Sequence, residues 1–175
     1  KDIYKKLTRK HTAQFLIIPV YISISPSESH ANMIIYDRFT EYAEIFEPHG
    51  SISNEYNYYQ IEKLKKNVEK IYRIKIKTLF KPSVTCPTRG PQQYNVSTVV
   101  DTKFDSDFNV SGYCVAWSYF ITYLRLMNPE DNLKDVQNMF LKQYGRESYY
   151  IVRNFHASFL HFKMSILEKN IPSNI

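Results

Sequence analysis

A cysteine, a histidine, a glutamate and a glutamine occur in this chain in an order suited to nucleophilic catalysis. Cys114 opens a strongly apolar stretch, residues 115–127, which has the composition of a buried helix. A thiol in the first turn of a helix lies near unpaired backbone N–H groups and the positive end of the helix dipole, which favour the thiolate. Because the thiolate is the nucleophile, Cys114 is a candidate catalyst, provided that a base, an orienting group and an oxyanion donor reach it.

Upstream residues have the types that those roles require. His30 begins one expected strand and Glu47 ends the next, so a hairpin would bring the two side chains together, with facing residues about 5 Å apart. The carboxylate could then accept the imidazole N–H, fix the tautomer and stabilise the imidazolium. Gln92 and Gln93 lie in a loop before the helix. The side-chain amide of either one could donate to an oxyanion together with the Cys114 N–H, and we prefer Gln92 for its Gly-Pro-Gln context.

Other residues of the same types offer alternatives for the base and the acid. His49 is the main rival base because it lies beside Glu47, although it follows Pro48 and so falls beyond the expected strand end. Asp37 could replace Glu47 as the acid. An extended strand would, however, place it roughly 20 Å from His30, since it comes seven positions later.

Each cysteine, and several of the histidines, could also have a purely structural role. Cys114 itself could be a packed core thiol, because free cysteines are among the most buried residues. Cys86 precedes a proline in a loop without helix support, so we expect it to be structural or at the surface. The other competing bases are His11, His156 and His161, of which the last two fall in the final helix and are expected to be structural.

The elements that must position these residues mix strands and helices. Apolar runs and alternation predict strands, and spacings of three and four residues predict helices. We expect strands over 15–18, 30–37, 42–47 and 74–80, loops over 23–29 and 82–93, a short hairpin near 99–100, and helices over 56–72, 113–127, 133–144 and 151–166. That order predicts an α+β fold, with residues 1–175 as a single catalytic domain and a fragment of a longer protein.

Composition restricts the class of protein and its compartment. The chain has 175 residues, 43% of them hydrophobic, and a net charge of +6, which describes a globular domain with weak attraction for acidic partners. Two cysteines exclude a disulfide framework and a cysteine-rich zinc site, so we expect a reducing, intracellular compartment. The longest apolar run, residues 15–22, is too short to span a bilayer, and no nucleic-acid motif accompanies the lysines of the 56–72 helix.

The order His, acid, Gln, Cys resembles the ubiquitin-like-protein protease family. This family includes the SUMO proteases, the adenovirus-type proteases and polyprotein-processing proteases of other large DNA viruses. Residues 30–37 look like its histidine strand, residues 42–48 like the strand that ends on the acid, residues 90–95 like its glutamine motif and residues 112–114 like its nucleophile motif. The resemblance covers roughly residues 30–129.

The chain departs from the family pattern at three places. Ala31 stands where an aromatic residue often follows the histidine, and Glu47 stands where many members have Asp. The glutamine and the cysteine are farther apart in the chain than is usual, so a segment at about 96–111 must loop out between them. We expect this segment to contact or gate the substrate.

The resemblance implies a papain-like cysteine protease fold, with a small mixed or antiparallel sheet packed on a central helix that carries the nucleophile. It implies hydrolysis of a peptide or isopeptide bond after a Gly-containing sequence, by a Cys-His-Glu triad without metal or cofactor. The implied substrate is ubiquitin, a ubiquitin-like protein or a viral polyprotein, and the implied location is host cytoplasm or virion. Gly112, Tyr113 and Trp117 are candidates to line the substrate channel, although Trp117 is also expected to pack in the core. An acetyltransferase on the same fold and a catalytically decayed binding module remain alternatives.

Overall fold

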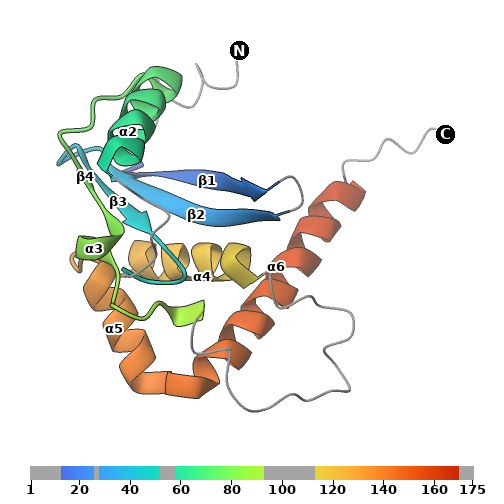
Figure 1. Ribbon diagram of the computed structural model, residues 1–175. Coiled ribbons are helices and arrows are strands. Elements are labelled where there is room, and N and C mark those ends of the chain that lie inside the picture. The colour runs from blue at the N-terminus through green and yellow to red at the C-terminus, as the bar shows by residue number, and fades with distance from the viewer. Residues whose placement is uncertain (1–12, 26–27, 52–57, 93–112, 170–175) are drawn as a thin grey trace.

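A four-stranded sheet with helices on both faces forms the framework of the protein (Figure 1). The structure, a computed structural model, describes residues 13–25, 28–51, 58–92 and 113–169. The strands are β1 (Phe15–Ser25), β2 (Glu28–Asp37), β3 (Tyr42–Phe46) and β4 (Thr78–Phe80), in the spatial order β1-β2-β3-β4. The first three pair antiparallel and β4 pairs parallel to β3, so the sheet is mixed.

The first hairpin is longer than the sequence indicates. The loop expected over 23–29 is wrong, because β1 continues to Ser25 and β2 starts at Glu28. Pro19 does not end β1, since this strand lies at the edge of the sheet, where a missing N–H need not break a ladder. The fourth strand is shorter than the expected 74–80. Ile76, which was expected in this strand, lies before it and donates its N–H to the Glu69 carboxylate.

Helices connect and cover the sheet. The helix α2 (Tyr58–Tyr72) crosses between β3 and β4, and α4 (Tyr113–Met127) has the bounds that the apolar run predicts. The loop expected from residue 82 instead begins with a short helix, α3 (Pro82–Thr85). The chain continues through α5 (Leu133–Tyr144), the 3-10 turn η3 (Gly145–Glu147) and α6 (Ser148–Lys169). Within the described ranges, no helix combines the length and apolarity needed to cross a membrane.

Alternation along β2 divides the core into two layers. Ile34 and Tyr36 face one side of the sheet, in a buried cluster that includes Val68 of α2. Met33 and Ile35 face the other side, in a cluster that includes Trp117 of α4. The sheet is therefore buried on both faces, and α4 lies directly beneath the strand that carries His30 (Figure 1).

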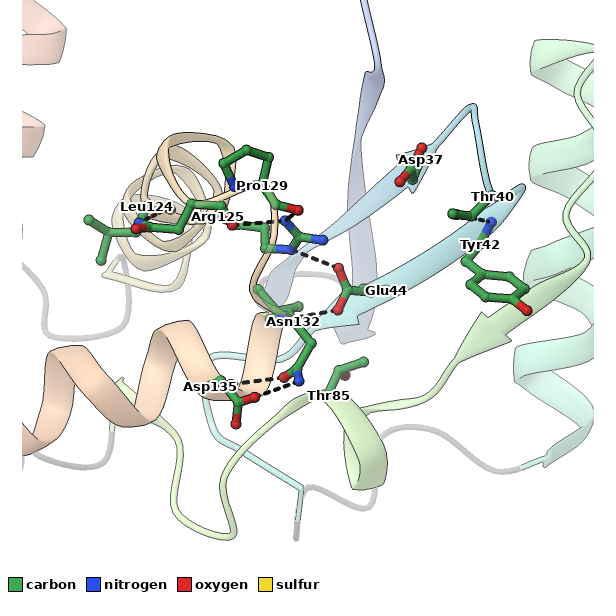
Figure 2. Close-up of polar contacts among 12 residues, drawn as sticks. Asp37, Thr40, Tyr42, Glu44, Thr85, Leu124, Arg125, Pro129, Asn132 and Asp135 are labelled. Atoms are coloured by element: carbon green, nitrogen blue, oxygen red, sulfur yellow. Dashed lines mark hydrogen bonds and ion pairs between the residues drawn. The ribbon is translucent and has the colours of Figure 1, made fainter.

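A largely buried ion pair ties the far end of α4 to β3 (Figure 2). Arg125 Nε lies 3.0 Å from Glu44 Oε2, with the two side chains 9% and 13% exposed. The other carboxylate oxygen accepts the backbone N–H of Leu133 at 2.9 Å, which attaches the start of α5 to the same strand. Arg125 also donates to the carbonyls of Asn128 and Pro129, at 3.2 Å each. One carboxylate thus joins β3, α4 and α5.

Replacing one partner of this pair should destabilise the fold. Arg125→Met leaves the Glu44 carboxylate buried without its cation, so we expect the free energy of unfolding in urea to fall by about 3 kcal/mol. Adding Glu44→Gln to that variant removes the unpaired charge and should recover part of the loss. The exposed Lys142→Met is the control, with a change within about 0.5 kcal/mol. A loss no larger than that of the control would contradict the role assigned to the pair.

Candidate active site

The hairpin of β2 and β3 brings His30 and Glu47 into contact. His30 lies near the start of β2, and Glu47 follows the last residue of β3. His30 Nε2 and Glu47 Oε1 are 2.7 Å apart, and both side chains are buried, at 5% and 0% exposure. The contact expected from the order of these strands is therefore present.

Glu47 is a carboxylate held inside the protein by several donors. Asn32 Nδ2 donates to Oε2 at 2.5 Å, and the backbone N–H of His49 donates to Oε1 at 2.9 Å. Burial by itself raises the pKa of Glu47, but the hydrogen bond and charge of His30 and these two donors outweigh it and lower the pKa below its usual value. The group therefore stays ionised while buried, which is the state that orients an imidazole.

Cys114 is the second residue of α4 and interacts with His30. Burial raises the pKa of the Cys114 thiol. It is outweighed by the hydrogen bond and charge of His30 and by the backbone groups of Ala31 and Val115, so the pKa is lowered. On the next turn of α4, Ser118 Oγ donates to the Ala31 carbonyl at 3.2 Å. The start of α4 is thus attached to the strand residue that follows His30.

The turn after Glu47 crosses the loop that carries Gln92. Gly90 N–H donates to the His49 carbonyl and Gln92 N–H donates to the Pro48 carbonyl, each at 3.0 Å. The backbones are so close that a Cβ at Gly90 would lie 2.2 Å from Gly50 N, and Gly50 has φ +93°. Both positions therefore require glycine. The crossing connects the loop of Gln92 to the turn that begins at Glu47.

The structure describes only one of the two candidate oxyanion donors, Gln92. Gln92 is partly buried, and its Oε1 accepts no hydrogen bond from the described residues, so that oxygen does not fix the orientation of the amide. Gln93 lies outside the described residues, as do Gly112 and the whole 96–111 segment, including the hairpin expected at 99–100. The choice between Gln92 and Gln93 stays a prediction.

The aromatic residues near the thiol pack inward. Trp117 is fully buried, and its ring makes edge contacts with Phe120 and Phe140, at centroid distances of 6.4 and 6.3 Å. The expectation that Trp117 packs in the core is therefore confirmed, because it sits one turn into α4, on the face that packs inward. Its place in a substrate channel stays a prediction. Tyr113 is also buried and contacts Tyr149 of α6, at 5.1 Å between centroids.

The alternative acid and the alternative cysteine lie in other surroundings. Asp37 accepts hydrogen bonds from Gln14 and from the Phe39 N–H at the far end of β2, so Glu47 is the acid that meets His30. Burial raises the pKa of Cys86 to about 11, and its sulfur accepts the Glu47 N–H at 3.3 Å. Cys86 is thus a structural thiol that helps to place Glu47.

The histidines expected to be structural lie on α6, away from this hairpin. Burial lowers the pKa of His156, and His161 is exposed. His11 lies outside the described residues.

Sequence reasoning missed Asn32 and the contact between His49 and His30. Asn32 lies two positions after His30 and faces Glu47 one step beyond the Met33–Phe46 pair of the ladder. A correct register would have identified it, because residues two apart on a strand share a face. His49 follows the end of β3, as expected, and which of the two histidines is the base stays a prediction. Its ring stacks on His30 with centroids 4.5 Å apart and an angle of 11°.

His30, Glu47 and His49 could be considered as metal ligands, since one atom of each lies within 4.8 Å of the others. The lone pair of an imidazole nitrogen lies in the plane of its ring. Because the two rings are nearly parallel, their nitrogens do not converge on one point. The stack would have to open before a single ion could use both histidines, so this arrangement suits proton transfer better than metal binding.

Comparison with known proteins gives limited information. No family model matches the chain, and no solved structure matches it. A protein of Acanthamoeba polyphaga mimivirus that is named an ankyrin repeat protein is 27% identical over 121 residues, which is 65% of this chain and 16% of that protein. Ankyrin repeats are units of about 33 residues with a turn and two helices, whereas the described part of this chain has a four-stranded sheet. That name therefore does not describe the elements seen here.

The opposite pKa shifts of the two thiols predict selective alkylation. Cys114 has a lowered pKa, so a larger fraction is thiolate at neutral pH, and its reaction with iodoacetamide should persist to lower pH than that of an ordinary thiol. Cys86, with a pKa of about 11, should stay unmodified in the native protein. Mass spectrometry of each cysteine peptide across pH 5–9 measures both rates. In His30→Ala the reaction of Cys114 should move to higher pH, and preferential labelling of Cys86 in the native protein would contradict the site.

Proposed function

We propose that this chain is a cysteine protease of the ubiquitin-like-protein protease type, which hydrolyses a peptide or isopeptide bond. The observation that carries the proposal is that one imidazole, His30, interacts both with a buried ionised carboxylate and with a thiol at the start of a helix. These are the three members of a Cys-His-acid triad, in which the carboxylate contacts the imidazole and the imidazole contacts the thiol. The proposal is also supported by the lowered pKa of Cys114 and by the α+β arrangement of sheet and nucleophile helix.

The mechanism follows from the positions of these groups. His30 accepts the proton of Cys114, and Glu47 holds the resulting imidazolium through Nε2. The thiolate attacks the scissile carbonyl, and a tetrahedral oxyanion forms. His30 then gives its proton to the leaving amine, which departs and leaves a thioester on Cys114. His30 next activates a water molecule, which hydrolyses the thioester and restores the thiol.

Two donors are assigned to the oxyanion, the backbone N–H of Cys114 and the side chain of Gln92. The backbone N–H of Cys114 lies in the first turn of the helix, where N–H groups lack intrahelical partners. Gln92 is the proposed side-chain donor, because its loop is hydrogen-bonded to the turn that follows Glu47. One such donor contributes about 3 kcal/mol to the transition state.

The proposed substrate class comes from the resemblance to the family and not from a contact in the described residues. It is a Gly-containing tail of ubiquitin or of a ubiquitin-like protein, or a Gly-containing viral polyprotein site. The partial identity to a mimivirus protein supports an origin in a large DNA virus. The chain spans 16% of that relative, so the activity of the longer viral protein is part of the same proposal.

A ubiquitin-like probe with a C-terminal electrophile tests the proposal directly. We expect covalent capture by the wild-type chain and by Cys86→Ser, and none by Cys114→Ala, with the circular dichroism spectrum of Cys114→Ala unchanged. Cleavage of ubiquitin, SUMO and diglycine-containing peptide substrates should disappear in the same variant. Cleavage at the wild-type rate by Cys114→Ala would overturn the proposal. Transfer of label from acetyl-CoA to protein, without cleavage, would indicate an acetyltransferase instead.

The acid can be tested separately from the nucleophile. Glu47→Gln keeps the size of the side chain but removes the charge that stabilises the imidazolium, so we expect kcat/KM to fall by at least about a hundredfold. Glu47→Asp shortens the reach but keeps the charge, and should retain more activity than the glutamine variant. Asp37→Asn, at the other end of β2, is the matched control and should keep wild-type kinetics. Equal kcat/KM for Glu47→Gln and wild type would exclude Glu47 as the orienting acid.

A further inference from the structure

Two histidines share one carboxylate at this site. Glu47 Oε1 lies 2.7 Å from His30 Nε2 and 3.7 Å from His49 Nδ1, and it also accepts the backbone N–H of His49. The His49 ring lies parallel to the His30 ring at 4.5 Å and covers it. His30 is almost fully buried, whereas the side chain of His49 is 37% exposed. His49 therefore lies between the proposed base and solvent.

The backbone of His49 is fixed on both sides. Its N–H donates to Glu47 and its carbonyl accepts from Gly90. It is the third residue of a turn that starts at Glu47, continues through Pro48 and closes with the Gly50 N–H on the Glu47 carbonyl at 3.0 Å. Proline at the second position and glycine at the fourth are favoured in such turns. The backbone of the residue that carries the stacked ring is thus held on both sides.

A proton on His49 would act on the other members of the site. The His49 ring lies against two titratable groups, His30 from β2 and Glu47 from the end of β3, and His30 in turn interacts with Cys114 of α4. A charged His49 would repel an imidazolium at His30, because like charges at this distance oppose each other. It would also attract the carboxylate oxygen that orients His30. Both effects disfavour the thiolate–imidazolium pair.

We propose that His49 is a positioning residue of the site, which holds the His30 ring in the orientation used by Cys114 and withdraws Glu47 from His30 when it is protonated. The inference rests on the proposed function, in which His30 and Cys114 form the reactive pair. A histidine suits this role because its ring is flat and carries a positive charge only when it is protonated. The consequence is a site that loses reactivity in acid more sharply than a lone Cys–His pair would.

The test uses alkylation of Cys114 by iodoacetamide, which needs no knowledge of the substrate. The rate is measured for the Cys114 peptide from pH 4.5 to 9 in the full chain, with circular dichroism to verify folding. For wild type we expect the alkylation rate to fall toward acid pH more steeply than the protonation of a single group would give. His49→Phe keeps a flat ring without the charge. In this variant the rate should fall with the slope of a single protonation, and the fall should occur at lower pH than in wild type. In His49→Ala, which loses the stack, the rate at neutral pH should fall about tenfold, and His49→Phe should recover most of that loss.

The outcomes separate this inference from the proposed function. His161→Gln removes an exposed histidine from α6 and should reproduce the wild-type profile. A wild-type slope in His49→Phe would overturn the role of the charge, and a wild-type rate in His49→Ala would overturn the role of the stack. If Cys114 of the wild-type chain reacts no faster than a free thiol at any pH, the proposed function itself fails.

Discussion

The site depends on a carboxylate that is kept charged inside the protein. Glu47 has no exposed surface, and a buried carboxylate without partners would take up a proton or destabilise the fold. His30, Asn32 and the backbone N–H of His49 each donate to it, so its charge is compensated from β2 and from the turn that follows β3. Those donors are available only when the β2–β3 register is correct, because a shift of one residue would turn Asn32 to the other face of the sheet. Folding and the electrostatics of the site are therefore coupled through one side chain.

Contacts between segments far apart in the chain fix the positions of Cys114 and of the loops at the site. Glu44 and Arg125 hold the end of α4 to β3, and Ser118 holds its beginning to β2. With both ends attached, the helix cannot slide along the sheet, and Cys114 stays beside His30. The close crossing at Gly50 and Gly90 does the same for the two loops that reach the site from the other side. Catalysis of the proposed kind requires such rigidity, because small displacements of reacting groups cost large factors in rate.

The two cysteines illustrate how surroundings decide the chemistry of a side chain. Both are buried, and both accept hydrogen bonds from the backbone. Cys86 is almost fully buried and lies beside the negative Glu47, so burial dominates and its pKa rises to about 11. Cys114 has the imidazole of His30, whose hydrogen bond and charge reverse the effect of burial. One thiol is thus suited to structure and the other to nucleophilic attack.

The sequence by itself predicted the main helices and strands and the contact between two of the candidate site residues. The apolar run predicted α4 at its observed bounds, and strand order predicted the contact between His30 and Glu47, because apolar runs and hairpins are local properties of the sequence. Only the tertiary structure decided the rest. The position of Asn32 depends on the register between strands, the stack of His49 depends on a turn locked by Gly90, and the burial of Trp117 depends on which face of α4 meets the sheet. Each of these involves residues far apart in the chain, and their contacts arise from packing, which local patterns do not encode.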